Sequence, residues 1–219
     1  MRRRTFVLAG LVCAALAATG CGSDEATAFA PGLQPLEEVT APAPTATASD
    51  PYPEVLVTRS GHLTEYDWAH GHAYVHAPIA RVYEALRDPE VNTDRRRVDS
   101  FTTTNDSEPD YPFSYRVHNV VNDVVTLEFD VSYRLGPLAG SEEVPTAVGL
   151  RYQKTFGSSF IDLMRGSAVA RQVNAEVTEV EIVRHLQSIS TNASDCETYV
   201  RDMYASLLAR VRGQPLPSY

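Results

Sequence analysis

The C-terminal stretch from Ser194 to Val211 constrains the fold of this chain more than any other. Ser194 and Glu197 have the spacing of a capping box, and Gly213 followed by Pro215 predicts where the helix ends. Between these signals, apolar residues recur at the three- and four-residue spacing of one helix face: Val200, Met203, Tyr204, Leu207, Leu208 and Val211. Six such side chains, fully buried, stabilise a fold by on the order of 10 kcal/mol, so this helix needs a broad apolar surface to lie on.

The segments before the helix have the patterns of strands. From Val125 to Leu135, apolar and polar residues alternate strictly, which is typical of a half-buried strand with one inner face. Further strands are predicted near residues 54–57, 72–77, 113–120, 147–155, 160–165 and 177–186. Short helices are predicted after Pro78 and Asp88, whereas residues 166–176 show no clear pattern. This order predicts an α+β domain, with an antiparallel sheet packed against one long C-terminal helix.

Composition limits the partners of this domain. The chain has 219 residues, 43% of them hydrophobic, and a net charge of −9. Without residues 1–20 it keeps 16 basic and 28 acidic residues, a net charge of −12. Such an acidic surface argues against nucleic acid and anionic lipid as partners. Beyond residue 21 only Cys196 remains as a thiol, so the domain has no internal disulfide.

The first 20 residues have the parts of an export signal. Three arginines at positions 2–4 precede an apolar run over residues 6–18. Ala18-Thr19-Gly20-Cys21 resembles a bacterial lipobox, which implies cleavage before Cys21 and lipidation of that cysteine. The prediction is a protein anchored to a membrane of the cell envelope, on the periplasmic face of the outer membrane if the host is Gram-negative. The alternative is an ordinary secretory peptide with a chance cysteine.

Residues 21–53 are rich in Ala, Pro, Thr and acidic residues and show neither helix nor strand periodicity. We therefore predict a disordered tether there. At ~3.1 Å per residue, thirty extended residues reach roughly 90 Å from a membrane. The folded domain is predicted over residues 54–219.

Residues 75–89, Val-His-Ala-Pro-Ile-Ala-Arg-Val-Tyr-Glu-Ala-Leu-Arg-Asp-Pro, resemble the opening of the START-like or SRPBCC superfamily, which includes polyketide cyclases and the birch-allergen family. That opening is a strand ending in Ala-Pro, a short helix with an aromatic residue (here Tyr83), and Asp-Pro. The resemblance implies a helix-grip fold, in which a curved sheet wraps the long helix and leaves a cavity. Members include binders, transporters and enzymes, so the resemblance does not decide function.

Two sets of residues are candidates for lining this cavity. Arg165 and Arg184 share strand parities with apolar residues, and an inward arginine suits a ligand carboxylate or phosphate. Their alternative is an arginine that reaches solvent or pairs with Asp162 or Glu176. The apolar candidates are Tyr115, Phe129, Tyr133, Tyr152, Met203 and Leu207. Each aromatic candidate, with Tyr204, has a role in an ordinary core as its alternative.

His70, His72 and His76 share one strand parity, a spacing that can place two imidazoles on one side for zinc. Because Ala73, Val75 and Ala77 make the better inner face, we interpret these histidines as facing solvent or a loop, and we predict no metal and no cofactor. Cys196 is interpreted as a surface thiol, since no base is placed to activate it. The sequence lacks the usual nucleophile, phosphate-loop and zinc-protease motifs.

Three functions remain open. The favoured one is a lipid-anchored protein that binds a small hydrophobic or lipid-like ligand between the sheet and the C-terminal helix. The second is a cyclase- or dehydratase-like enzyme, which needs a polar pair in the cavity. The third is an interaction protein whose cavity is filled by its own aromatic side chains. An open cavity of a few hundred Å³ separates the first two from the third.

Overall fold

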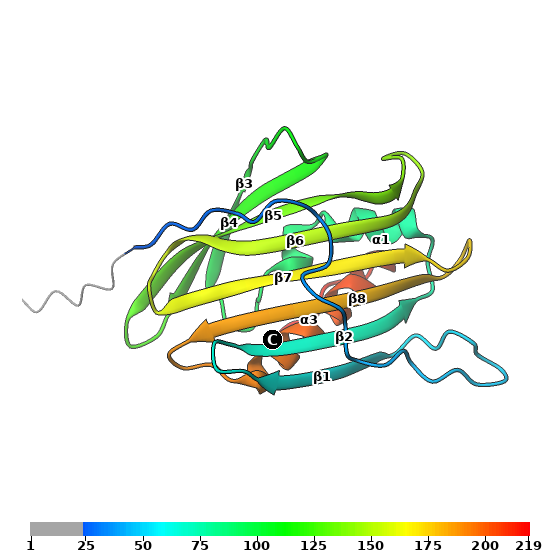
Figure 1. Cartoon of the computed structure of the whole chain (residues 1–219), viewed down its shortest axis with the longest axis horizontal. Coiled ribbons are helices and arrows are strands. Elements are labelled where there is room, and N and C mark those ends of the chain that lie inside the picture. Colours follow the sequence, from blue (N-terminus) through cyan, green and yellow to red (C-terminus); the bar gives the residue numbers. More distant parts are fainter. Residues whose placement is uncertain (1–23) are drawn as a thin grey trace, which may run out of the picture.

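The computed structural model describes residues 24–219 and shows one curved antiparallel sheet with a long helix on its inner face (Figure 1). The strands are β1 (Leu56–His62), β2 (Asp67–Val75), β3 (Ser100–Asn105), β4 (Phe113–Asn122), β5 (Thr126–Gly140), β6 (Pro145–Gly157), β7 (Ile161–Gln172) and β8 (Thr178–Ser188). Their order in the sheet is β1-β2-β8-β7-β6-β5-β4-β3. The helices are α1 (Ile79–Leu86), α2 (Pro89–Asn92) and α3 (Ala193–Val211). This is the predicted α+β helix-grip architecture.

Helix α3 supplies the apolar stripe that the sequence predicts, with Val200, Met203 and Leu207 fully buried against the sheet. Its start differs from the prediction. Asn192, not Ser194, is the N-cap, and Asp195 completes the capping box. Asn is as favourable an N-cap residue as Ser, and here the helix begins two residues earlier than expected.

The strands follow the predicted alternation, and β5 buries Phe129, Val131, Tyr133 and Leu135 on its inner side. The unassigned residues 166–176 include the second half of β7, which runs on to Gln172. This half of β7 is buried on both faces and therefore lacks a period of two.

The outer face of the sheet is covered by the segment before β1, as Figure 1 shows. The amides of Glu25 and Thr27 donate to carbonyls at the end of β6, 3.1 and 2.9 Å away. Farther along, the Leu36 amide donates to Ser167 Oγ on β7 (3.0 Å). The expected disordered tether is therefore corrected for residues 24–41, which lie against the domain, whereas residues 45–49 are exposed. The sequence predicts disorder because this segment has no helix or strand periodicity. It is held instead by isolated contacts to neighbouring strands, which leave no pattern in the sequence.

Two glycines of the sheet make room for this segment, and one arginine packs against it. Gly136 and Gly149 face each other across β5 and β6, and a Cβ on Gly149 would lie 2.6 Å from the Leu33 carbonyl oxygen. On the same face, Arg134 is almost fully buried beneath the ring of Phe29, at 5.1 Å. The segment thus shields polar side chains that strand alternation alone assigns to solvent.

The predicted signal peptide and Cys21 lie outside the described residues. Among residues 24–219, no helix combines the length and the hydropathy needed to cross a bilayer.

Candidate ligand-binding cleft

A cleft of about 630 Å³ lies where the ends of β4, β5, β7 and β8 meet the segments before β3 and α3. Its buried apolar wall is formed by Phe129, Ile161 and Leu186, together with the half-buried Met164. Its rim carries four further apolar residues: Val124, Val125, Phe160 and Ile189. Volumes of this size are usual for small-molecule sites. The space between sheet and helix is therefore open at this end.

Arg184 on β8 brings a positive charge to the cleft, although its side chain is only 4% exposed. Its guanidinium stacks over the ring of Tyr199, 4.0 Å from the centroid. The nearest acid is Asp94, whose Oδ2 is 4.0 Å from Nη2 of Arg184, and Nε has no hydrogen-bond partner. An arginine stays protonated even when buried, so this cation is held with incomplete compensation.

Gly166 on β7 leaves room for the side chain of Tyr152 beside this arginine. It sits between Tyr152 and Arg184 in the sheet, and a Cβ there would lie 2.2 Å from the Tyr152 hydroxyl. That hydroxyl is buried and makes no hydrogen bond of good geometry within the described residues, although Arg184 and Tyr199 lie beside it. The Tyr152 ring thus lies beside the cleft, 5.8 Å from the guanidinium carbon of Arg184, whose Nε has no partner.

Asp94 also lines the cleft, and burial raises the pKa of its carboxyl group, against the opposing effects of Arg184 and Arg97. The other charged groups at the opening have partners of their own. Arg96 makes a two-pronged ion pair with Asp202 on α3, at 2.7 and 3.0 Å. Arg184 and Asp94 are consequently the charged groups best placed to meet a ligand.

The rest of the space between sheet and helix is filled by stacked tyrosines. The rings of Tyr115 and Tyr133 lie 4.6 Å apart and nearly parallel. Their hydroxyls bond the side-chain amide and the carbonyl of Asn92 at 2.7 and 3.2 Å, and Tyr199 bonds the same carbonyl at 2.9 Å. Burial raises the pKa of all three phenols, so they remain neutral hydrogen-bonding groups. This half of the interior is core.

The predicted site residues divide among three places. Phe129 and Arg184 line the cleft, and Tyr152 flanks it through Arg184. Tyr115, Tyr133, Met203 and Leu207 are buried in the core and do not line the cleft. Sequence reasoning missed Asp94, Ile161, Met164, Leu186 and Ile189. Asp94 precedes β3 in a loop without periodicity, so no pattern in the sequence marked it.

Arg165 is corrected by the structure, because it lies on the outer face. A register shift between Ile161 and Leu163 reverses the parity of β7, so that Met164 turns inward and Arg165 outward. There its Nε donates to Nδ1 of His185 at 3.3 Å, and its guanidinium lies 5.7 Å from the Tyr66 ring centroid.

His185 belongs to a cluster on the outer face with His70 and Glu37. One carboxylate oxygen of Glu37 is 2.5 Å from Nε2 of His70 and 2.9 Å from Nε2 of His185. The three possible ligand atoms lie within 4.8 Å of one another, which raises the question of a metal. The amide of Thr40, however, donates to Nδ1 of His70, as Arg165 does to His185. Each Nε2 must then carry a proton, so the cluster fits a hydrogen-bonded clasp better than a metal centre.

The histidines of β2 thus point away from α3 as predicted, but the N-terminal segment and not solvent covers them. His70 is 3% exposed, and His72 bonds Glu179 at 2.8 Å and the Ala41 carbonyl at 3.3 Å. Cys196 is a second correction. It lies in the first turn of α3 with its side chain fully buried, and burial raises the pKa of its thiol to about 11. It is not the surface thiol that we expected.

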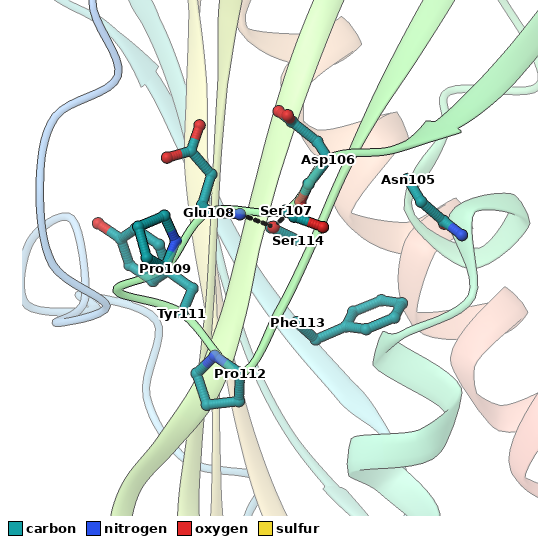
Figure 2. Close-up of a pocket in the computed structure, with 9 residues that line it drawn as sticks. All are labelled: Asn105, Asp106, Ser107, Glu108, Pro109, Tyr111, Pro112, Phe113 and Ser114. Carbon is teal, nitrogen blue, oxygen red and sulfur yellow. Dashed lines mark hydrogen bonds between the residues drawn. The ribbon is translucent and has the colours of Figure 1, made fainter.

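A second hollow, of about 440 Å³, lies in the turn between β3 and β4 (Figure 2). Its walls come from residues 105–114 alone, and the Glu108 amide donates to Ser114 Oγ at 3.1 Å. Figure 2 shows the carboxylates of Asp106 and Glu108 pointing away from Phe113. Both acids already pair with Arg134, at 3.2 and 2.8 Å. The hollow is a feature of one turn and lies outside the space between sheet and helix.

Comparisons with known proteins agree with this architecture. Human STARD10 matches with a TM-score of 0.50 and 6% identity over 80% of this chain and 75% of its own. Human StAR-related lipid transfer protein 5 matches with a TM-score of 0.49 and 11% identity, over 72% and 82% of the two chains. The ZhuI aromatase/cyclase from Streptomyces sp. R1128 matches with a TM-score of 0.47 and 14% identity, over 68% and 93%. No family model and no curated protein matches the sequence.

Proposed function

The chain has the START-like helix-grip fold, and we propose that it binds a small hydrophobic ligand with an anionic group in the cleft between sheet and helix. The observation that carries this proposal is the cleft of about 630 Å³, which joins a buried apolar wall to Arg184. Lipid-transfer proteins and an aromatase/cyclase among the matched structures agree with a hydrophobic ligand and do not identify it.

The anionic group follows from the state of Arg184. Its Nε–H is buried without a partner, and Asp94 is at the limit of ion-pair distance. A buried donor without a partner costs about 1–3 kcal/mol, so a ligand that supplies an acceptor there gains affinity. A carboxylate can accept two parallel hydrogen bonds from one guanidinium, which a hydroxyl cannot do.

The test compares a medium-chain fatty acid with the alcohol of the same length, by calorimetric titration of the purified protein. We expect the acid to bind about tenfold more tightly, a difference of ~1.4 kcal/mol. Arg184→Met should bind the two equally, whereas Arg59→Gln, at an exposed position on β1, should behave like the parent protein.

The outcomes separate the two parts of the proposal. Equal binding of acid and alcohol by the parent protein contradicts the role of Arg184 and leaves the hydrophobic cleft standing. If neither compound binds, and apolar fluorescent probes are not taken up either, the binding function itself is refuted. The protein then fits the interaction role, in which the tyrosine core is the relevant filling.

One observation favours the enzymatic alternative. Asp94 has a raised pKa beside Arg184 in the cleft, and a half-buried carboxyl group of this kind is suited to transfer protons. A cyclase- or dehydratase-like protein would release its bound compound with one water fewer, as mass spectrometry detects. Asp94→Asn should then abolish conversion without abolishing binding. A compound recovered unchanged from the parent protein would argue for binding alone.

We further propose that Cys21 carries a lipid anchor in the cell envelope. The lipobox-like residues 18–21 after an apolar run support this. Globomycin treatment, which blocks cleavage of lipobox signals, should cause the precursor to accumulate. Unchanged processing, or a Cys21→Ser variant that is cleaved as efficiently as the parent protein, would contradict the anchor.

A further inference from the structure

We infer that the rim of the cleft is a docking surface for a lipid bilayer, and that the short connection to Cys21 holds it there. The inference rests on the proposed anchor at Cys21 and deepens the proposed binding function, because it makes the bilayer the source or destination of the ligand.

The rim is apolar and exposed. Val124 and Val125 in the β4–β5 turn are 97% and 52% exposed, and Ile189 after β8 is 75% exposed. All three line the cleft, together with the half-buried Phe160. Exposed apolar side chains around the opening of a hydrophobic cleft are a usual sign of a contact surface.

The N-terminal segment begins beside this rim. Asp24 forms a bridge with Ser158, next to the end of β6. The Phe160 amide donates to Ser158 Oγ at 3.3 Å, and the Phe160 carbonyl accepts from the amide of Ile189 at 3.4 Å. Hydrogen bonds therefore connect the start of the described chain to two rim residues. In Figure 1 the start of the segment lies at the same end of the sheet as the β4–β5 turn.

Three residue steps separate Cys21 from Asp24. At no more than ~3.6 Å per residue, they span roughly 11 Å. An anchor at Cys21 thus keeps Asp24, and with it the rim, within about that distance of the lipid headgroups. The other end of the sheet, with the β5–β6 turn, must point away from the membrane.

The charge of the chain decides the kind of bilayer. The portion from Cys21 on has a net charge of −12, and Asp24, Glu25 and Asp123 lie near the rim. The two arginines at the opening, Arg96 and Arg97, are already paired with acids of α3. Anionic lipids would be repelled, so docking relies on the apolar rim and on the anchor. A small apolar rim is enough because the anchor makes contact with the surface an intramolecular event.

The experiment places a tryptophan on either side of the molecule. The Cys21 thiol of the chain from residue 21 is coupled to a maleimide lipid in phosphatidylcholine vesicles, while the buried Cys196 thiol stays unmodified. In a Trp68→Phe background, Ile189→Trp reports on the rim. Val144→Trp is the matched control, because this residue is 71% exposed in the opposite turn. Quenching by brominated lipid measures contact with the acyl chains.

We expect brominated lipid to quench Trp at 189 at least threefold more than Trp at 144. Equal quenching at the two sites, or stronger quenching at 144, overturns the inference. A Gly-Ser linker of twenty residues inserted before Asp24 should abolish the difference. If the difference persists, the short connection is not its cause, and the anchoring argument fails. The solution titration of fatty acid tests ligand binding separately, so a failure of docking does not count against the cleft.

Discussion

Replacing Arg184 by methionine should make the protein more stable while removing its preference for an anionic ligand. Removal of one partner of a well-made buried ion pair costs about 3–5 kcal/mol, whereas replacement of a whole buried pair by apolar residues is often neutral or stabilises by about 1–4 kcal/mol. At Arg184 the pair with Asp94 is loose, at 4.0 Å, and Nε is unpaired, so losing this pair should cost less than about 3–5 kcal/mol and removing the buried charge should outweigh that cost.

The expected gain is at the low end of that range. Stacking of the guanidinium on Tyr199 at 4.0 Å contributes about 1–2 kcal/mol, which the variant loses. In the variant the Asp94 side chain is still 17% exposed and still has the positive charge of Arg97 nearby, so it is not left as an isolated buried charge. We therefore expect a net gain of about 1 kcal/mol, or roughly 2–4 °C in Tm.

Urea unfolding followed by near-UV circular dichroism measures this difference, with Arg59→Met on the surface as the control that should not change. A loss of 3 kcal/mol or more in Arg184→Met would mean that the guanidinium holds the fold together. That result would refute the reasoning and would remove the physical basis for an anion-binding arginine.

Three further predictions concern the outer face and the core. Glu37→Gln should lower the free energy of unfolding by about 1–2 kcal/mol, measured in urea, because two imidazole donors lose their shared carboxylate; no change would mean that the clasp contributes nothing. Burial lowers the pKa of His185 below 6.5, and the two histidine hydrogen bonds outweigh burial to lower the pKa of Glu37 below 4.5. The contribution of His185 and Glu37 to the stability of the fold is therefore complete above about pH 6.5 and is lost as the pH falls. The urea midpoint of the parent protein should drop between pH 7 and 5, and the midpoint of His185→Gln should drop less. His72, whose pKa is raised by Glu179, acts in the opposite direction, so the comparison with the variant is the diagnostic one. The Cys196 thiol, with a pKa of about 11, should react with Ellman's reagent at pH 8 only as fast as the protein unfolds, and rapid labelling of the native protein would contradict its burial.

The fold could be predicted because each of its main elements has a hydrophobic pattern that is visible within a short stretch of sequence. The stripe from Val200 to Val211 and the alternation along β5 each require one apolar partner face, and the opening at residues 75–89 fixed the family resemblance. The cap of α3 was misplaced because Asn192 and Ser194 both satisfy the rule for capping residues. Only the local backbone geometry decides between them.

The cleft was predicted only in part, since a cavity depends on what several strands leave empty. Arg184 was identified because β8 keeps its alternation, while Arg165 was misplaced because one shifted residue in β7 reverses every later side chain. The tyrosines were a single set in the sequence. In the structure Asn92 bonds Tyr115, Tyr133 and Tyr199 within a closed core. The buried wall of the cleft consists instead of Phe129, Ile161 and Leu186 with the half-buried Met164.

The N-terminal segment changes what an anchor at Cys21 would mean. A disordered tether would let the domain move freely up to roughly 90 Å from the membrane, with any side facing the lipid. Residues 24–41 are held on the outer face, and only three residue steps separate Cys21 from Asp24, which forms a bridge with Ser158 beside the rim. The clasp of Glu37 with His70 and His185 is one of the contacts that fix the segment. Residues far from the cleft would then set how the cleft faces the bilayer, so Glu37→Gln should weaken the quenching difference between positions 189 and 144 without changing fatty-acid affinity in solution. If Glu37→Gln lowered the quenching difference and the fatty-acid affinity equally, the segment would support the structure of the cleft and not its orientation.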